Sequence, residues 1–185
     1  MVKQKVLELA NHISRKKIGS KNGITEFDPE YMILEPVVTE EMAEVVLCME
    51  IRKKATAAQL APLCGKSVEL TEKLLWELAV AGVCFVNKID GVDTYWYDTW
   101  VPGIMEMMVN NKENVKKYPQ IPAAFEAYGR VRGPKTTGAF PVGVGLMRVI
   151  PIEKAIDGET RRASYEEVSK YLNDNKIFSV SDCSC

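Results

Sequence analysis

The chain has 185 residues, of which 46% are apolar, so it can bury a core and is long enough for one large domain or two small ones. Its 24 lysines and arginines are balanced by 25 acidic residues, which excludes an overall positive field for attracting nucleic acid or an anionic membrane. No run approaches the roughly 18 apolar residues of a membrane span, and the N-terminus lacks the apolar core of a signal peptide. The sequence therefore predicts a cytoplasmic protein with no membrane partner.

Residues 1–38 are predicted to form an N-terminal helix and loop. Apolar residues recur at helical spacing from Lys3 to Lys17, which predicts the helix. Residues 19–29 contain two glycines and a proline and are expected to be a loop, whereas the apolar run 32–38 is expected to be extended. His12 is the only histidine and has no second histidine for a metal pair, so we expect it on the surface or on the flank of the helix, without a catalytic role.

Residues 39–128 are predicted to form a winged helix-turn-helix domain with trailing helices. Three residues suit helix N-caps, because their hydroxyls can accept hydrogen bonds from free backbone N–H groups: Thr39, Thr56 and Ser67. The first helix is expected to run to about Ile51, the second to break at Gly65, and the third to stop at Gly82. The third helix would be the recognition helix of such a domain.

A β-hairpin, the wing, is predicted directly after this third helix. Two β-rich runs, 83–87 and 94–97, flank the Asp90-Gly91 pair, which supplies the positive φ angles of a tight turn. On the third helix, helical spacing places Leu70, Leu74 and Leu78 on one face. We expect Leu74 and Trp76 to pack against the first helix of the domain, at Val45, Val46 and Met49.

Two trailing helices are expected after the wing. The first should span Trp100–Val109 with Pro102 in its first turn, and the second should begin at Pro122 and end at Gly129. Residues 129–145 contain five glycines and two prolines and are predicted to be a linker loop. A nucleotide-binding loop is not expected there, because neither glycine run ends in Gly-Lys-Ser/Thr followed by a helix.

Residues 146–185 are predicted to form a strand-helix-strand element that ends in Cys-x-Cys. The strands are expected at 146–152 and 177–181, and the Ser164 capping box should open a helix that runs to about Asn175. The predicted fold class is therefore mainly α with a small β component (α+β), a winged helix-turn-helix followed by this C-terminal element.

The five cysteines do not resemble a secreted disulfide framework. Cys48, Cys64 and Cys84 are expected to pack as small buried apolar residues. Cys183 and Cys185 are two positions apart, so in an extended chain both thiolates can face one metal ion or cluster. Because two ligands do not close a site, we expect this pair to be metal-free and accessible here, and to become ligands only with sequence beyond Cys185.

Several segments together resemble the N-terminal region of large iron-sulfur flavoproteins of anaerobes. They are the winged-helix unit at 55–97, Val101-Pro-Gly-Ile-Met-Glu, Leu146-Met-Arg-Val-Ile-Pro and Cys183-Ser-Cys185. The resemblance implies a winged-helix front end before ferredoxin-type 4Fe-4S clusters and a pyridine nucleotide-disulfide oxidoreductase module that uses FAD and NAD(P). The ferredoxin cysteine runs and the glycine fingerprints for FAD and NAD are absent from these 185 residues, so oxidoreductase activity would belong to a longer parent protein.

The expected function is that of a non-catalytic accessory or docking domain of such an electron-transfer enzyme. Its partners would be neighbouring redox domains of a longer chain or a second copy of this one. We nominate no catalytic and no cofactor-binding residue, because no nucleophile with a base partner and no paired carboxylates in an apolar setting can be assembled.

The alternative function is a winged-helix DNA-binding transcriptional regulator. In that case four cations that flank the helix-turn-helix would bind nucleic acid: Arg52, Lys53, Lys54 and Lys66. The recognition helix opposes this alternative, because Glu69, Glu72 and Glu77 outnumber its single Lys73 and would repel phosphates. We therefore do not expect DNA binding.

Overall fold

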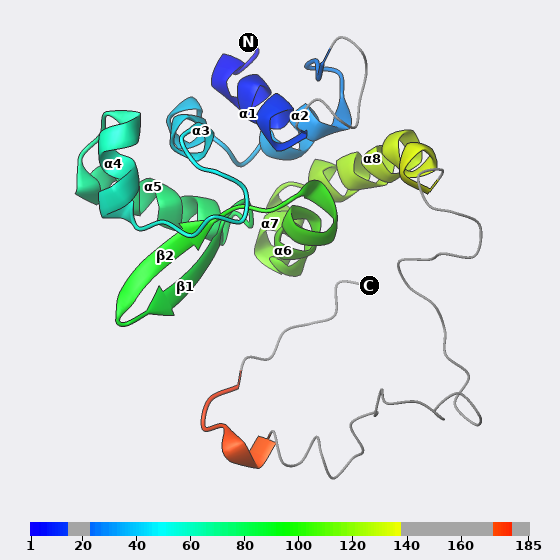
Figure 1. The fold of residues 1–185 in the computed structure, drawn as a ribbon. Helices are drawn as coiled ribbons and strands as arrows, with labels where there is room; N and C mark the ends of the chain where they lie inside the picture. Colours follow the sequence, from blue (N-terminus) through cyan, green and yellow to red (C-terminus); the bar gives the residue numbers. More distant parts are fainter. Residues whose placement is uncertain (15–22, 138–171, 179–185) are drawn as a thin grey trace. The chain divides into compact units, whose positions relative to one another are not determined.

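The computed structural model describes residues 1–14, 23–137 and 172–178 (Figure 1). The chain divides into two compact units, residues 1–139 with 184–185 and residues 140–183. The described part is mainly helical with one two-stranded antiparallel sheet, which confirms the α+β class. The elements of the first unit are α1 (Gln4–Ser14), α2 (Pro29–Leu34), α3 (Glu40–Leu47), α4 (Ala57–Cys64), α5 (Val68–Val80), β1 (Phe85–Ile89), β2 (Val92–Trp96), the irregular turn Trp100–Ile104, α6 (Met105–Asn110), α7 (Lys112–Lys117) and α8 (Gln120–Thr137).

Helix α2 replaces the extended segment that the sequence predicts at 32–38. Pro29 occupies the first turn, where its missing N–H costs no helical hydrogen bond, and Tyr31, Ile33 and Leu34 are buried. A short apolar run fits a strand or a buried helix equally well by periodicity. The prediction was wrong because it gave no weight to Pro29 as a helix-start signal.

The three predicted N-caps of α3, α4 and α5 are confirmed. Each cap hydroxyl accepts a hydrogen bond from the backbone N–H three residues later: Thr39 from Met42 (3.2 Å), Thr56 from Gln59 (3.3 Å) and Ser67 from Leu70 (3.2 Å). Gly65 ends α4 in the left-handed conformation, with φ 65°, as expected for the turn between the two helices. Helix α3 is shorter than predicted, because it ends at Leu47 and not near Ile51.

The predicted hairpin is confirmed. Strand β1 pairs antiparallel with β2, from Phe85 opposite Trp96 to Ile89 opposite Val92. Asp90 and Gly91 have φ angles of 50° and 82°, which a two-residue hairpin turn requires. Figure 1 shows the hairpin extending beyond the helices next to α5, and contacts of β1 with α5 and of β2 with α4 hold its base.

The helix predicted at Trp100–Val109 begins only at Met105. Val101, Pro102 and Gly103 have non-helical backbone angles, and the Val101–Pro102 peptide bond is cis. Pro102 therefore lies before α6 and not in its first turn, which corrects the prediction. The apolar side of this segment is buried as expected, with Ile104 and Met108 almost inaccessible to solvent.

Helix α8 does not end at Gly129 but continues to Thr137, so the linker predicted from residue 129 is wrong over 129–137. A glycine inside a helix costs only about 1 kcal/mol relative to alanine. Arg132, one turn after Gly129, anchors the helix through ion pairs to Glu30 of α2 and to Asp28, the residue before α2. The remainder of the predicted linker, 138–145, lies outside the described residues.

The predicted strand-helix-strand element falls mostly outside the described residues, which exclude the strand at 146–152 and the Ser164 cap. Residues 172–174 form a helical turn, which agrees with the end of the predicted helix. Ile177 and Phe178, the described part of the second predicted strand, are not in a strand.

One hydrophobic core serves the first unit. This core contains residues from both 1–38 and 39–128, whereas the sequence analysis predicts these two segments as separate parts of the chain. Contacts of α1 with α3 and of α2 with α8 bring these segments together. The side chains at its centre are at most 2% exposed and include Val6, Leu9, Ile33, Leu34, Leu75, Leu78, Tyr95, Tyr97, Ile104, Met108 and Ile121.

Gly82 ends α5 at a place where the backbone leaves no room for a side chain. Its φ is 83°, and a Cβ there would lie 2.7 Å from the Met108 nitrogen. Gly91 has a similar φ of 82° but nothing within 4 Å. Gly82→Ala should therefore lower the free energy of unfolding by about 1–3 kcal/mol more than Gly91→Ala, because only the first substitution overpacks the interior. Urea denaturation of both variants measures the difference, and equal losses would contradict the close approach of Gly82 to the α6 backbone at Met108.

Candidate interaction surface on helix α5

Helix α5 has a buried face and an exposed face. The buried face carries Thr71, Leu74, Leu75 and Leu78, as the apolar spacing predicts. Trp76 lies on the other side, with 53% of its surface exposed. The prediction that Trp76 packs against α3 is therefore wrong, because a residue two positions from both Leu74 and Leu78 must point away from their face of a helix.

The exposed face of α5 combines acidic and large apolar side chains. Val68 and Val80, near its two ends, are 43% and 53% exposed. Between them a shallow hollow of about 530 Å³ is lined by Glu69, Glu72, Lys73, Trp76, Glu77 and Tyr95. We call these six residues the α5 surface. Its formal charge is negative by two, since three carboxylates face one ammonium group that pairs with Glu77 at 3.9 Å.

Tyr95 fixes one wall of the α5 surface. This residue of β2 is fully buried, and its hydroxyl donates a hydrogen bond to Glu72 Oε1 at 3.2 Å. Burial and the neighbouring Glu72 carboxylate raise the pKa of Tyr95 to about 12, so the phenol keeps its proton at neutral pH. This bond holds one of the three carboxylates in place beside Trp76.

Four cations were predicted to bind nucleic acid. The first three lie in the turn after α3, and each has an intramolecular partner. Arg52 binds Asp98 through Nε (2.9 Å) and Nη2 (2.8 Å). Lys53 binds Glu50 at 2.6 Å. Lys54 lies 5.2 Å from the centre of the Trp96 ring, in range for a cation–π contact. These contacts reduce the charge that the turn offers to a phosphate.

Lys66, the fourth cation, lies in the turn between α4 and α5 and is largely buried. Its side chain is 12% exposed and its ammonium group lies 2.8 Å from Glu44 and 3.6 Å from Glu41 of α3. The hydrogen bond from Lys66 lowers the pKa of Glu44. Lys66 therefore ties the turn between α4 and α5 to α3 and is not presented to a ligand.

We expect no specific binding of this chain to duplex DNA at physiological salt, because α5 is acidic and these cations are paired. A mobility-shift titration tests this, with Glu69→Lys/Glu72→Lys/Glu77→Lys as a positive control that should gain salt-sensitive binding. A sequence-selective shift by the unaltered chain at nanomolar concentration would contradict the expectation. Alanine substitutions at Arg52, Lys53, Lys54 and Lys66 should then weaken it.

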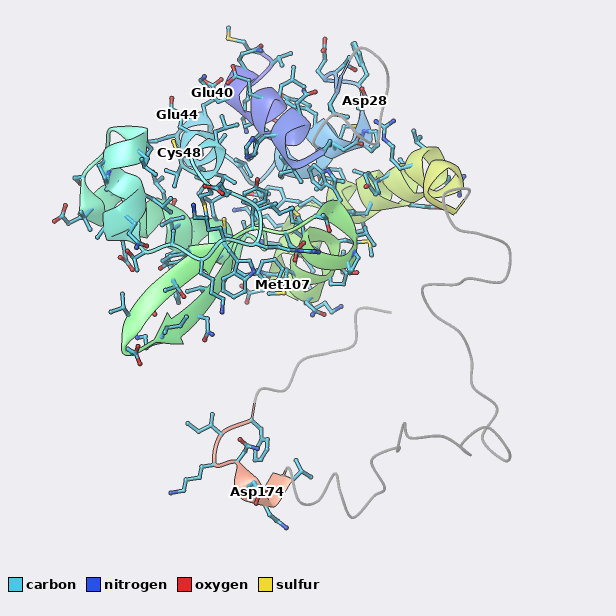
Figure 2. All side chains as sticks on the ribbon, in the orientation of Figure 1. Asp28, Glu40, Glu44, Cys48, Met107 and Asp174 are labelled. Atoms are coloured by element: carbon cyan, nitrogen blue, oxygen red, sulfur yellow. The ribbon has the colours of Figure 1, made fainter. Side chains whose placement is uncertain are left out.

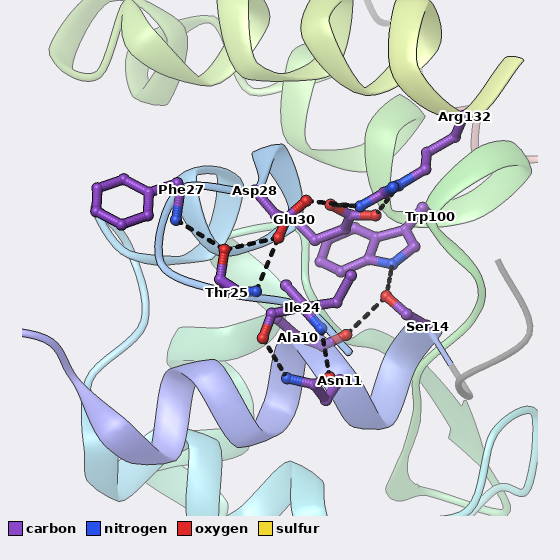
Figure 3. A network of polar contacts seen from close by, with 10 residues as sticks. All are labelled: Ala10, Asn11, Ser14, Ile24, Thr25, Phe27, Asp28, Glu30, Trp100 and Arg132. Atoms are coloured by element: carbon purple, nitrogen blue, oxygen red, sulfur yellow. Dashed lines mark hydrogen bonds and ion pairs between the residues drawn. The ribbon is translucent and has the colours of Figure 1, made fainter. Parts of the chain in front are cut away.

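A buried ionic network joins α8 to α2 (Figure 3), and no local sequence pattern predicts it. Arg132 binds both carboxylate oxygens of Glu30, through Nε at 2.6 Å and Nη2 at 3.0 Å, and binds Asp28 at 2.9 Å. Glu30 is fully buried and Arg132 is 3% exposed. In the same region Trp100 Nε1 donates to Ser14 Oγ at 3.0 Å. These bonds join α1, α2, α8 and the turn at Trp100 to one another, so we assign the network a structural role.

Asp28 also closes the turn before α2. Its carboxylate accepts hydrogen bonds from the Thr25 N–H and hydroxyl, both at 2.8 Å. Burial alone would raise the pKa of Asp28, but the bonds from Thr25 and Arg132 outweigh it and lower the pKa. The turn and the end of α8 are therefore held by one carboxylate.

The structure agrees with the predictions for His12 and Cys84 but not with those for Cys48 and Cys64. His12 lies on the flank of α1 as predicted, with Nε2 2.8 Å from Tyr97 Oη and 3.3 Å from Met49 O. Cys84 is buried, also as predicted. Cys48 and Cys64 are only half-buried, which corrects the prediction for these two, because they lie at the ends of α3 and α4 and not in their interiors.

The predicted metal ligands Cys183 and Cys185 lie outside the described residues. Within 1–14, 23–137 and 172–178, no three His, Cys, Asp or Glu side chains are grouped so that they could hold a metal ion. None of the helices in these ranges is both long and apolar enough to cross a membrane. In comparisons with known proteins, no family model, no curated protein and no solved structure matches the chain.

Proposed function

We propose that this chain is a docking domain of an iron-sulfur flavin oxidoreductase, without catalysis of its own, and that it binds a basic protein surface through the α5 surface. We further infer that α3, α4, α5 and the β1–β2 hairpin form a winged helix whose recognition helix, α5, contacts protein. The resemblance of the sequence to iron-sulfur flavoproteins supplies the kind of neighbour: redox modules of the same cytoplasmic enzyme.

The observation that carries the proposal is the exposure of Trp76 among Glu69, Glu72 and Glu77. A tryptophan that is half exposed and ringed by charge is typical of the central contact in a protein interface. The acidic ring favours lysine and arginine on the partner, and an arginine side chain can also stack on the indole ring. The same charge repels the DNA backbone, which opposes the alternative of a transcriptional regulator.

Photo-crosslinking in the natural gene product tests the proposal. Trp76 is replaced by p-benzoylphenylalanine, the cells are irradiated, and the crosslinked peptides are identified by mass spectrometry. We expect crosslinks to basic segments of a redox module, either in the same polypeptide or in its partner subunit. The matched control carries the same residue at Phe27, which is 78% exposed but lies before α2.

Two outcomes would overturn the docking proposal. One is a yield of protein crosslinks at position 76 no higher than at position 27, and the other is crosslinking mainly to DNA. A second variant, Glu69→Lys/Glu72→Lys, tests the charge argument separately. It should reduce crosslinking from position 76 while leaving the circular dichroism spectrum unchanged, because Glu69 is exposed and Glu72 is at the surface of the hollow.

Cys183 and Cys185 enter the proposal as ligands of an iron-sulfur cluster that needs downstream residues. A cluster held by thiolates would carry electrons toward a flavin, and the two cysteines would supply part of its ligand set. The natural gene product should therefore lose iron and acid-labile sulfide when both cysteines are replaced by serine. Anaerobic iron and sulfide assays measure the loss, and an unchanged content in Cys183→Ser/Cys185→Ser would remove these residues from the proposal without affecting the α5 surface.

A further inference from the structure

Cys48 and Cys64 lie at neighbouring helix ends. Cys48 follows the last residue of α3, and Cys64 is the last residue of α4. The Cys48 thiol donates to the carbonyl oxygen of Leu63 at 3.5 Å, and Leu63 is bonded directly to Cys64. Figure 2 labels Cys48 at the end of α3, with Glu44 one turn before it. The Glu44–Lys66 ion pair also joins α3 to the turn that follows α4.

The two thiols also interact with each other. Burial, and after it the neighbouring Cys64 thiol, raise the pKa of the Cys48 thiol, which agrees with the bond from Cys48 to the residue before Cys64. The Cys64 thiol itself is directed to Leu60 O at 3.2 Å, on the last turn of α4.

Solvent can reach this pair, in contrast to Cys84. Both cysteines are half-buried, and Cys48 lines an open hollow of about 260 Å³ with Lys53, Lys54 and Leu63. Cys84 is fully buried, which raises the pKa of its thiol to about 12 and makes it inert. The hollow gives a small reagent access to Cys48 first.

We propose that Cys48 and Cys64 form a reversible disulfide bond by exchange with a small-molecule disulfide. The Cys48 thiolate attacks one sulfur of the reagent, which releases one thiol and leaves a mixed disulfide. The Cys64 thiolate then attacks the Cys48 sulfur, so the protein disulfide forms and the second thiol leaves. The protein loses two electrons and two protons, and the reagent gains them. This inference is independent of the docking function.

The bond would clamp the end of α3 to the end of α4. It closes a loop of the chain between residues 48 and 64, which restricts the unfolded state and so stabilises the folded one. It would also fix the orientation of the helix-turn-helix on α3, because Cys64 immediately precedes the turn at Gly65. The oxidised domain should therefore present the α5 surface on a more rigid scaffold.

The test uses the full chain with Cys183→Ser/Cys185→Ser, so that the tail thiols cannot contribute. It is equilibrated with glutathione disulfide, its free thiols are alkylated, and its tryptic peptides are identified by mass spectrometry. We expect a peptide that links Cys48 to Cys64 within one chain, an unmodified Cys84, and a melting temperature several degrees higher than that of the reduced protein. Dithiothreitol should reverse all of these changes.

Single substitutions provide the controls. Cys48→Ser and Cys64→Ser should abolish the linked peptide and the rise in melting temperature, whereas Cys84→Ser should retain both. The proposal is overturned if Cys48 and Cys64 are recovered as free thiols, as stable mixed disulfides with glutathione, or in bonds between two chains. A linked peptide accompanied by a lower melting temperature would show that the bond distorts the helix ends, and would overturn the clamp.

Discussion

Arg132→Ala should lower the free energy of unfolding by about 3–5 kcal/mol, the usual cost of leaving one charge of a buried ion pair without its partner. The substitution removes both bonds to Glu30, which is fully buried, and the bond to Asp28. Urea denaturation followed by circular dichroism measures the loss.

Arg130 provides a matched control two residues away on the same helix. Its side chain is 79% exposed and pairs with Glu126 at the surface. Because surface ion pairs contribute at most about 1 kcal/mol, Arg130→Ala should have little effect. A loss for Arg132→Ala no larger than that for Arg130→Ala would contradict the buried network.

The charge itself can be separated from the loss of packing. Adding Glu30→Gln to Arg132→Ala removes the carboxylate that has lost its partner, so the double variant should recover part of the lost stability. If the two sites were independent, the second substitution would only add its own loss. If the double variant is less stable than Arg132→Ala alone, the loss comes from packing of the arginine side chain and not from the buried charge.

The network also predicts a change in acid sensitivity. The pKa of Asp28 is lower in the folded protein than in the unfolded chain. Ionised Asp28 therefore stabilises the fold at pH values above its unfolded pKa, and this stabilisation is lost as the pH falls through its folded pKa. Arg132→Ala removes one cause of that lowering. The variant should therefore lose less stability than the unaltered protein between neutral and acidic pH, which denaturation at several pH values measures.

Local signals predicted the starts of α3, α4 and α5 and the hairpin, because each depends on residues within a few positions. The Thr39 hydroxyl needs only the N–H of Met42, and the turn at Asp90-Gly91 needs only two residues that accept a positive φ. These features do not depend on the rest of the fold, so the sequence pattern was sufficient for them.

Contacts between distant residues could not be predicted in this way. Glu30 and Arg132 are 102 positions apart, and no property of either neighbourhood indicates the other. Their bond explains why α8 continues past Gly129 where composition indicated a linker. Part of the α5 surface is predictable, because helical spacing alone places Trp76 opposite Leu74 and Leu78. The prediction of a buried Trp76 followed from the hydrophobicity of tryptophan and not from its position on the helix.

The buried face of α5 supports the other large prediction. Leu74 is 4% exposed and belongs to the core, in which α5 contacts α3. Leu74→Ala should lower the free energy of unfolding by about 2–5 kcal/mol, because it loses the transfer energy of the side chain and leaves a cavity that rigid neighbours fill only partly.

The control for Leu74→Ala is Trp76→Ala on the opposite face of the same helix. Trp76 is larger than Leu74, so if side-chain size alone decided the loss of stability, Trp76→Ala would be the more destabilising substitution. Its exposed fraction of 53% reverses that ranking, because much of its surface is already in water in the folded state. Urea denaturation of both variants should therefore show the larger loss for Leu74→Ala, with Trp76→Ala still folded. A loss below about 1 kcal/mol for Leu74→Ala, as at surface sites, would show that the two faces of α5 are assigned in reverse.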